Sequence, residues 1–366
     1  MTRSRAAIFA VAGLVVALRS MAVADVNMEY VTVGDPGNAG ELSGSGAGGF
    51  GLDRICGAVD YVYRIGKYEV TNAQYAQFLN AVAMVGDPHG VYNSNMGGGW
   101  NDIGGISRSG SGTEAEPWEY SARADRGNRP VNYVSWGDAA RFCNWLTNGQ
   151  PTGAQDAITT EDGSYTLNGA TSREDLTAVT RNGDALYVIP SEDEWYKAAY
   201  YKGGGTSAGY WEYPTQSDTA PTAEAPAGTD LVNGSANYYD GGYVDPTDYT
   251  TEVGAYDVRP SDSAYGTFDQ GGNVAEWNEA IFSSALRRGV RGGMFRFHDS
   301  VLHAASRDYV EPTLEITYYG FRVAEVPEPA TVALLALGGL AMLQRRRLSG
   351  AHRGGPTAVA LCGFAL

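Results

Sequence analysis

Three segments of the chain share one pattern, in which strand-forming residues lead directly into an amphipathic helix. Behind Thr71, apolar residues recur at i, i+3, i+4 and i+7, and these positions are Tyr75, Phe78, Leu79 and Val82. Thr71 and Gln74 have the spacing of a capping box, in which each side chain accepts a hydrogen bond from the backbone N–H of the other residue. The pattern predicts a helix that begins after Thr71 and follows a strand within 61–70.

Two further segments carry the same helix-start signal. Ser135 precedes a helix whose predicted buried residues are Trp136, Ala139, Phe142, Cys143 and Leu146. Ser191 and Glu194 form another capping box, which lies between strand-like residues 187–190 and the apolar positions Trp195, Ala198 and Ala199. Each of these helices is expected to bury one face.

The segments between the helices are polar and rich in turn-forming residues. Residues 28–33 have the aromatic and β-branched character of a strand. Residues 87–128 are rich in Gly, Ser and Asn, which indicates long surface loops. Residues 151–184 have the character of an insertion, with a hairpin predicted around 164–169. Short strands, a few capped helices and much irregular chain together indicate an α+β class.

The composition agrees with a loop-rich fold. The chain has 366 residues, of which 49 are Gly and 24 are Tyr, and 43% are hydrophobic, enough for a sizeable core. The formal net charge of −16 argues against nucleic acid and anionic lipid as partners, because phosphate binding requires a basic face. An acidic surface is compatible with cation binding or with simple solubility, and both interpretations stay open.

The three cysteines, Cys56, Cys143 and Cys362, match no zinc-binding spacing. If the chain is exported, Cys56 and Cys143 can form one disulfide, whereas two reduced and buried thiols are an equal alternative.

Residues 1–24 have the features of a secretory signal peptide. Arg3 and Arg5 precede an apolar run over 6–18, and small residues at 22–24 fit a cleavage site. The alternative is an N-terminal membrane anchor, which the shortness of the apolar run disfavours. A Gly-rich segment, residues 25–59, is expected to lead into the main domain.

The most informative stretch lies within 266–323. It contains Gly271-Gly272-Asn273-Val274-Ala275-Glu276-Trp277, then Arg291-Gly292-Gly293, Arg307 and Gly320-Phe321-Arg322. Asn273 and Glu276 are three residues apart, so both can direct oxygen ligands at one spot from the start of a helix. With three earlier segments, 69–72, 130–136 and 190–195, this stretch resembles the formylglycine-generating enzyme (sulfatase-modifying factor) family. The ordered match favours one domain over 60–325.

The resemblance implies a compact, loop-rich domain related to C-type lectins, which holds structural calcium. A first calcium site would fall on Asn273 and Glu276 with the Val274 carbonyl. A second would use Asn237, the Tyr238 carbonyl, and either Asp245 or Asp248, of which we select Asp248. The alternative for the first site is a helix cap, with Asn273 as N-cap and Glu276 at the third helical position.

The resemblance also bears on catalysis. Oxidases of the family bind copper(I) through two cysteines that follow the Arg-Gly-Gly segment, and here Phe297 and Leu302 occupy those places. We therefore expect no copper and no oxidation of sulfatase cysteines. Arg291, Arg307 and Arg322 are interpreted as structural residues that pair with carboxylates or carbonyls.

A histidine-based iron site is the other chemistry to weigh. A branch that resembles this domain holds non-haem iron with three histidines, but only His298 and His303 lie in the corresponding region here. Arg296, His298 and His303 are a candidate catalytic pocket, and the alternative is a polar surface loop.

The last part of the chain changes character. A Pro-Glu-Pro motif over 327–329, an apolar run over 331–343 and Arg345-Arg346-Arg347 resemble a PEP-CTERM sorting signal. The run is shorter than the ~20 residues of a stable transmembrane helix, which predicts a transient membrane anchor over 326–347. Residues 348–366 form a tail that the resemblance does not explain.

These observations predict a bacterial protein that is exported to the periplasm, outer surface or extracellular matrix. We expect a binding or structural module, with glycans or matrix and a sorting machinery as partners. The alternative is a metal-dependent oxidoreductase or protein-maturation enzyme that uses the same domain.

Overall fold

The computed structural model describes residues 25–327. The predicted signal peptide, residues 328–347 of the sorting segment, the tail 348–366 and Cys362 lie outside the described residues. Within 25–327, no helix has the length and apolar character needed to cross a membrane.

The first of two four-stranded sheets joins both ends of the described chain. Its order is β1 (Tyr30–Val33), β4 (Tyr63–Gly66), β14 (Ala324–Glu325) and β7 (Tyr187–Val188), and every neighbouring pair is antiparallel. The last described strand, β14, therefore lies inside the sheet, between β4 and β7.

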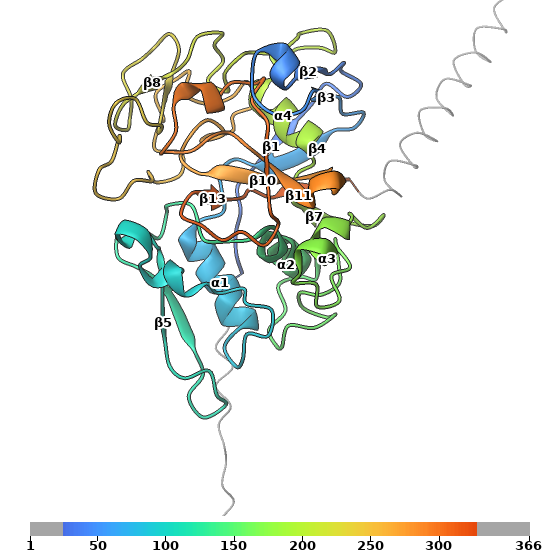
Figure 1. The fold of residues 1–366 in the computed structure, drawn as a ribbon, viewed down its shortest axis with the longest axis vertical. Helices are drawn as coiled ribbons and strands as arrows, with labels where there is room; N and C mark the ends of the chain where they lie inside the picture. Colours follow the sequence, from blue (N-terminus) through green and yellow to red (C-terminus); the bar gives the residue numbers. More distant parts are fainter. Residues whose placement is uncertain (1–24, 328–366) are drawn as a thin grey trace, which may run out of the picture.

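The second sheet crosses the middle of the molecule (Figure 1). Its order is β12 (Asp308–Val310), β11 (Arg287–Arg291), β10 (Ala275–Phe282) and β13 (Tyr319–Gly320). Strands β10, β11 and β12 are antiparallel neighbours, whereas β13 is parallel to β10.

The prediction that Asn273 and Glu276 begin a helix is wrong. Glu276 lies in strand β10, where it is opposite Arg291 of β11 and Gly320 of β13. Asn273 precedes the strand with a φ of 55°, a left-handed conformation that Asn tolerates better than most residues. Pairing with two strands on either side determines the conformation here, and a local helix signal does not override it.

The three predicted helix starts are confirmed. Helices α1 (Asn72–Val82), α2 (Trp136–Thr147) and α4 (Glu192–Tyr200) begin after Thr71, Ser135 and Ser191, and each has a complete capping box. A further short helix, α3, spans Arg173–Ala178. In Figure 1, α1 and α2 lie on one side of the central sheet and α4 lies on the other. Between α1, α2 and the sheet, the rings of Tyr75, Phe78, Phe142, Trp145 and Phe321 form one buried aromatic cluster.

Two loop predictions need correction. Within 87–128, β5 (Ile106–Ser109) and β6 (Glu119–Ala122) form an antiparallel pair, and β6 packs on α1, where Asn80 exchanges two hydrogen bonds with the Tyr120 backbone. Around 164–169 there is no hairpin, because the Asn144 side chain instead bonds both the N–H and the carbonyl of Tyr165. The only backbone pairing of Tyr165 among the described residues is an isolated antiparallel bridge to Arg181.

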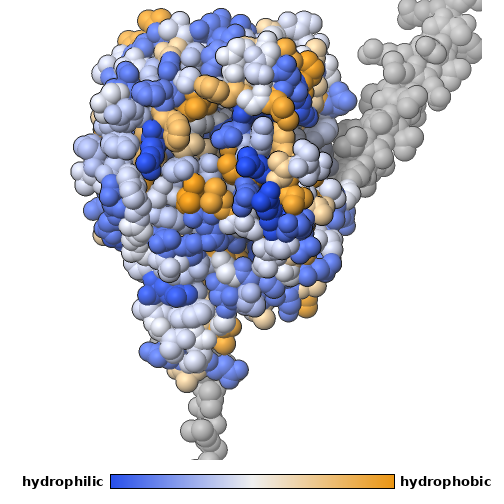
Figure 2. Space-filling view, in the orientation of Figure 1, coloured by the Kyte–Doolittle hydropathy of each residue, from blue (hydrophilic) through white to orange (hydrophobic). Residues whose placement is uncertain are grey.

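The remaining regular elements are short. They are β2 (Glu41–Ser43) paired with β3 (Arg54–Cys56), β8 (Thr222–Ala223) paired with β9 (Ser235–Ala236), and 3₁₀ turns at Ser45–Ala47, Ser94–Gly97, Trp100–Asp102, Ser283–Ala285 and Asp299–Val301. The fold is thus mixed α+β with few helices and short strands, as predicted. Figure 2 shows apolar side chains in the middle of one face, at the level of the central sheet, with strongly hydrophilic side chains among them.

Cys56 and Cys143 are both buried and both free thiols. Of the two alternatives for this pair, the structure therefore has the reduced thiols. Burial raises the pKa of Cys143 well above its usual value, which keeps this thiol protonated and inert.

Candidate functional site

A cleft of about 430 Å³ opens beside the central sheet. Strands β11, β12 and β13 line it, together with Ala275 at the start of β10, residues 50–51 and the loop 293–301. Its large apolar side chains are Phe50, Met294, Phe297, Tyr309, Tyr318 and Tyr319, and its charged ones are Arg287, Arg291, Arg307 and Asp308. A concave site that combines apolar walls with a few placed polar groups is the usual form of a small-ligand site.

Five aromatic side chains line the cleft: Phe50, Phe297, Tyr309, Tyr318 and Tyr319. Phe297 is 45% exposed, and its ring centroid lies 6.4 Å from that of Tyr318, which in turn lies 5.0 Å from Tyr319. Tyr309 stacks on Phe282 with a centroid distance of 4.1 Å and an interplanar angle of 27°. The stacked and packed rings present a firm surface to a ligand.

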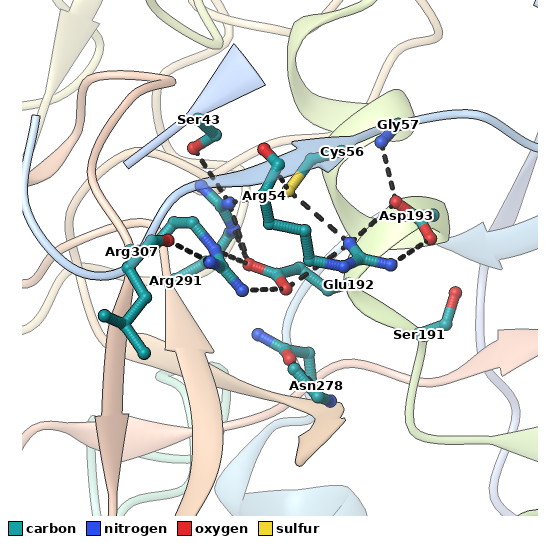
Figure 3. A network of polar contacts seen from close by, with 12 residues as sticks. Ser43, Arg54, Cys56, Gly57, Ser191, Glu192, Asp193, Asn278, Arg291 and Arg307 are labelled. Carbon is teal, nitrogen blue, oxygen red and sulfur yellow. Dashed lines mark hydrogen bonds and ion pairs between the residues drawn. The ribbon is translucent and has the colours of Figure 1, made fainter. Parts of the chain in front are cut away.

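Behind the cleft lies a buried ion network centred on Glu192, the first residue of α4 (Figure 3). Arg291 donates from Nε to Glu192 Oε1 at 2.9 Å, and Arg307 donates from Nε to the same oxygen at 2.7 Å. Arg307 Nη2 also donates to Glu192 Oε2 at 2.7 Å. Burial alone would raise the pKa of Glu192, but the Arg291 and Arg307 guanidiniums outweigh it and lower this pKa to about 2.

The network ties together segments that are far apart in the sequence. Arg291 also donates to the Ser306 carbonyl and to Ser43 Oγ, so it joins β11 to the chain before β12 and to β2. Arg54 forms a two-point pair with Asp193, next to Glu192 (Figure 3). The prediction that Arg291 and Arg307 pair with carboxylates or carbonyls is confirmed.

The predicted pocket residues Arg296, His298 and His303 do not come together. Arg296 lies over the Trp100 ring at 5.2 Å, and His298 contacts the Tyr239 ring at 5.4 Å. His303 Nε2 lies 2.9 Å from Glu212 Oε2. None of the three lines the cleft, because each is held by a different neighbour on the exposed side of its loop. Among residues 25–327, no three His, Cys, Asp or Glu side chains are grouped so that they could hold a metal ion.

The two positions that the resemblance assigns to copper ligands differ in surroundings. Phe297 lies at the cleft surface, whereas Leu302 is fully buried. No cysteine is among the described residues that line the cleft. The polar side chains that line the cleft are Arg287, Arg291, Arg307, Asp308 and Ser306.

The predicted calcium ligands separate into two groups. Asn237 and Asn273 are adjacent: Asn237 Nδ2 donates to Asn273 Oδ1 at 3.3 Å, while Asn273 Nδ2 donates to Glu69 Oε2 at 2.8 Å. Glu276, within strand β10, is engaged by another partner. Its two oxygens accept from Arg322 at 2.5 and 2.6 Å.

This geometry restricts where calcium fits. Both Glu276 oxygens are engaged by Arg322, and Trp195 donates to one of them as well, so Glu276 has no free oxygen in this conformation. Asp248 is similarly paired with Arg126 and Arg129, and Asp245 lies 3.4 Å from Arg129. Asn237 differs, because its buried Oδ1 accepts no hydrogen bond. Asn237 is thus the predicted ligand that best fits a cation, whereas Val274 and Tyr238 could contribute carbonyls only.

Sequence reasoning missed two buried acids beside this group, Glu69 and Asp269. Burial, Asp269 and Glu276 together raise the pKa of Glu69 well above its usual value, and burial raises the pKa of Asp269 to about 6. Arg322 is the cation that these buried acids face. Glu69 belongs to the segment 69–72 that carried the resemblance, so its position was a usable signal.

Comparison with known proteins extends this description. The pattern of the family described as "Sulfatase-modifying factor enzyme 1-like domain" matches residues 59–326. A curated protein from Thermomonospora curvata, named formylglycine-generating enzyme, is 24% identical over 300 residues, which cover 72% of this chain and 82% of that protein. Variable protein 1 of Treponema denticola has a similar fold, with a TM-score of 0.50 and 18% identity over 83% of this chain and 97% of that one.

A second pattern matches the end of the chain. The PEP-CTERM protein-sorting motif covers residues 325–347. This motif indicates export and sorting to the cell surface, and it implies a sorting machinery as partner.

Proposed function

We propose, from the premise that this chain belongs to the sulfatase-modifying factor enzyme 1-like family, that it is a surface binding module without copper oxidase activity. The resemblance places the copper-binding cysteines at Phe297 and Leu302, and neither side chain can bind copper or act as a redox thiol. The sorting motif supports a function outside the cytoplasm.

The proposed ligand is a glycan of the cell surface or extracellular matrix. One observation carries the proposal: the cleft presents Phe297, Tyr309 and Tyr318 where the resemblance places redox chemistry. Sugar rings expose apolar C–H faces that stack on aromatic side chains, while their hydroxyls need a few polar groups such as Asp308. A family fold without its reactive residues can still serve as a scaffold for such a site.

The test compares glycan binding with oxidase activity. We expect calorimetric titration with surface oligosaccharides to detect binding, and Phe297→Ala to raise Kd about two- to twelvefold, since one ring contact contributes about 0.5–1.5 kcal/mol. Trp100→Ala is the matched control, because Trp100 is 37% exposed but does not line the cleft. Conversion of a cysteine-containing sulfatase peptide to formylglycine by the purified protein would overturn the proposal.

Elemental analysis decides the alternative of a metal-dependent oxidoreductase or protein-maturation enzyme. Stoichiometric iron or copper in the purified protein would favour that alternative, and substitutions of His298 and His303 would then be tested for metal loss. No contact within residues 25–327 brings these two histidines together, so the binding module is the better-supported function.

A further inference from the structure

Arg287, at the start of β11, differs from the other arginines that line the cleft. Arg291 and Arg307 are buried and bound to Glu192, whereas none of the ion pairs found among residues 25–327 includes Arg287. Its Nε is buried without a hydrogen-bond acceptor, and its Nη1 reaches only the Tyr309 carbonyl, at 3.5 Å. Part of the donor capacity of this guanidinium is therefore unused within the described protein.

The neighbouring residue, Arg288, has a hydrogen-bond acceptor for each nitrogen of its guanidinium group. Arg288 is buried, and its guanidinium donates to the backbone carbonyls of Leu176, Thr177, Val179 and Glu279. Successive residues of a strand point to opposite faces, so Arg288 faces the core while Arg287 faces the cleft. Arg288 therefore holds backbone carbonyls together in the core, and Arg287 has no comparable set of carbonyl partners among the described residues.

The position of Arg287 is defined by the aromatic wall. Its guanidinium carbon lies 5.9 Å from the centre of the Tyr309 ring, which stacks on Phe282. In the β10–β11 pair, Phe282 lies directly opposite Arg287. The charged group thus lies beside Tyr309, one of the rings that are proposed to contact a sugar.

The charge balance of the cleft also favours an anion. Arg291 and Arg307 share the carboxylate of Glu192, which Arg54 also approaches at 3.4 Å while it forms its shorter ion pair with Asp193. Three arginines and one aspartate line the cleft, in a protein with a formal net charge of −16. Asp308 does not neutralise Arg287 through a direct ion pair: burial raises the pKa of Asp308, and Arg287 opposes this only in part. A locally positive cleft in an acidic protein attracts a small anionic group, and its charge does not oppose the binding of the neutral parts of a sugar.

We propose that the cleft selects acidic sugars, and that Arg287 binds the carboxylate of a uronic acid residue stacked on the aromatic wall. The planar guanidinium fork matches a carboxylate through two parallel hydrogen bonds. This inference rests on the proposed glycan-binding function and adds a ligand class and a specificity-determining residue to it.

The test uses matched ligands on the purified full-length protein. An oligogalacturonate is titrated beside the same oligomer with its carboxylates methyl-esterified, which changes the charge and leaves the rings. We expect the free acid to bind on the order of ten- to a hundredfold more tightly, the range of one charge-assisted two-point contact. Equal affinity for the two oligomers would overturn the role of Arg287 while leaving glycan binding intact. Failure of every oligosaccharide to bind would overturn the proposed function as well.

Matched variants locate the effect. Arg287→Gln should remove the preference for the free acid, and Arg287→Lys should retain part of it, because Lys keeps the charge but not the fork. Arg296→Gln removes the same charge from an exposed position outside the cleft and should leave the preference unchanged. An unchanged preference in Arg287→Gln, or its loss in Arg296→Gln, would overturn the assignment.

Two further ligands separate the sources of the anion. If a sulfated oligosaccharide binds more tightly than the oligogalacturonate, the preferred anion is a sulfate ester and not a carboxylate. That result would overturn the uronate assignment. If oligoglutamate of similar charge binds as tightly as the oligogalacturonate, the cleft recognises a peptide carboxylate equally well. That result would overturn the assignment of a sugar as the ligand.

Discussion

Replacing Glu192 by Gln should destabilise the protein strongly while preserving the size of the side chain. The carboxylate is buried and accepts from Arg291 and Arg307, and its pKa is lowered from an ordinary 4.5 to about 2. A difference of that size corresponds to roughly 3 kcal/mol at about 1.36 kcal/mol per pKa unit. Leaving two buried guanidiniums without their carboxylate gives a similar figure, about 3–5 kcal/mol. We therefore expect a loss of about 3 kcal/mol in the free energy of unfolding at pH 7.

The pH dependence of this loss follows from the direction of the pKa shift. Since the folded pKa of Glu192 lies below the unfolded one, its contribution is complete above about pH 5 and declines as pH falls toward 2. The difference between the wild type and Glu192→Gln should shrink over the same window.

Urea unfolding followed by tryptophan fluorescence, repeated from pH 7 down to pH 3, measures both quantities. The control is Glu311→Gln, which breaks an exposed pair with Arg173 and should change the unfolding free energy by less than about 0.5 kcal/mol. A loss below about 1 kcal/mol for Glu192→Gln, or a loss that stays constant down to pH 3, would refute the electrostatic account of the network.

Three other predictions concern the cap, the thiols and calcium. Ser191→Ala should lower the unfolding free energy by about 1 kcal/mol in urea titration, because the N-cap of α4 is lost, and a neutral effect would contradict the capping box. Cys56 and Cys143 should react with a thiol reagent only after denaturation, and rapid reaction of both in the folded protein would contradict their burial. If calcium binds at Asn237, a chelator should lower Tm in the wild type but not in Asn237→Ala, and identical melting curves with and without chelator would argue against the ion.

Local signals explain what the sequence could predict. The starts of α1, α2 and α4 were predictable because a capping box is complete within four residues, Thr71–Gln74 in the first case. The pairing of Arg291 with a carboxylate was also predictable from the chemistry of a buried guanidinium. The partner itself was not, because Glu192 lies 99 residues away along the chain.

The features that depend on residues far apart in the sequence could not be predicted. The Asn-x-x-Glu spacing of Asn273 and Glu276 suits a helix start, and only the flanking strands β11 and β13 make it a strand. The cleft was missed for the same reason. Arg287, Tyr309 and Tyr318 belong to no motif, and they become one surface only when β11, β12 and the segment before β13 lie together.

The place of β14 has a consequence for how the protein is made and exported. Strand β7 is joined to its sheet only through β14, so the sheet cannot close until residues 324–325 have been synthesised and translocated. The sorting motif begins at residue 325, within the same strand. The motif therefore starts inside a hydrogen-bonded sheet, so processing at its first residues would have to act beside the paired strands β4 and β7.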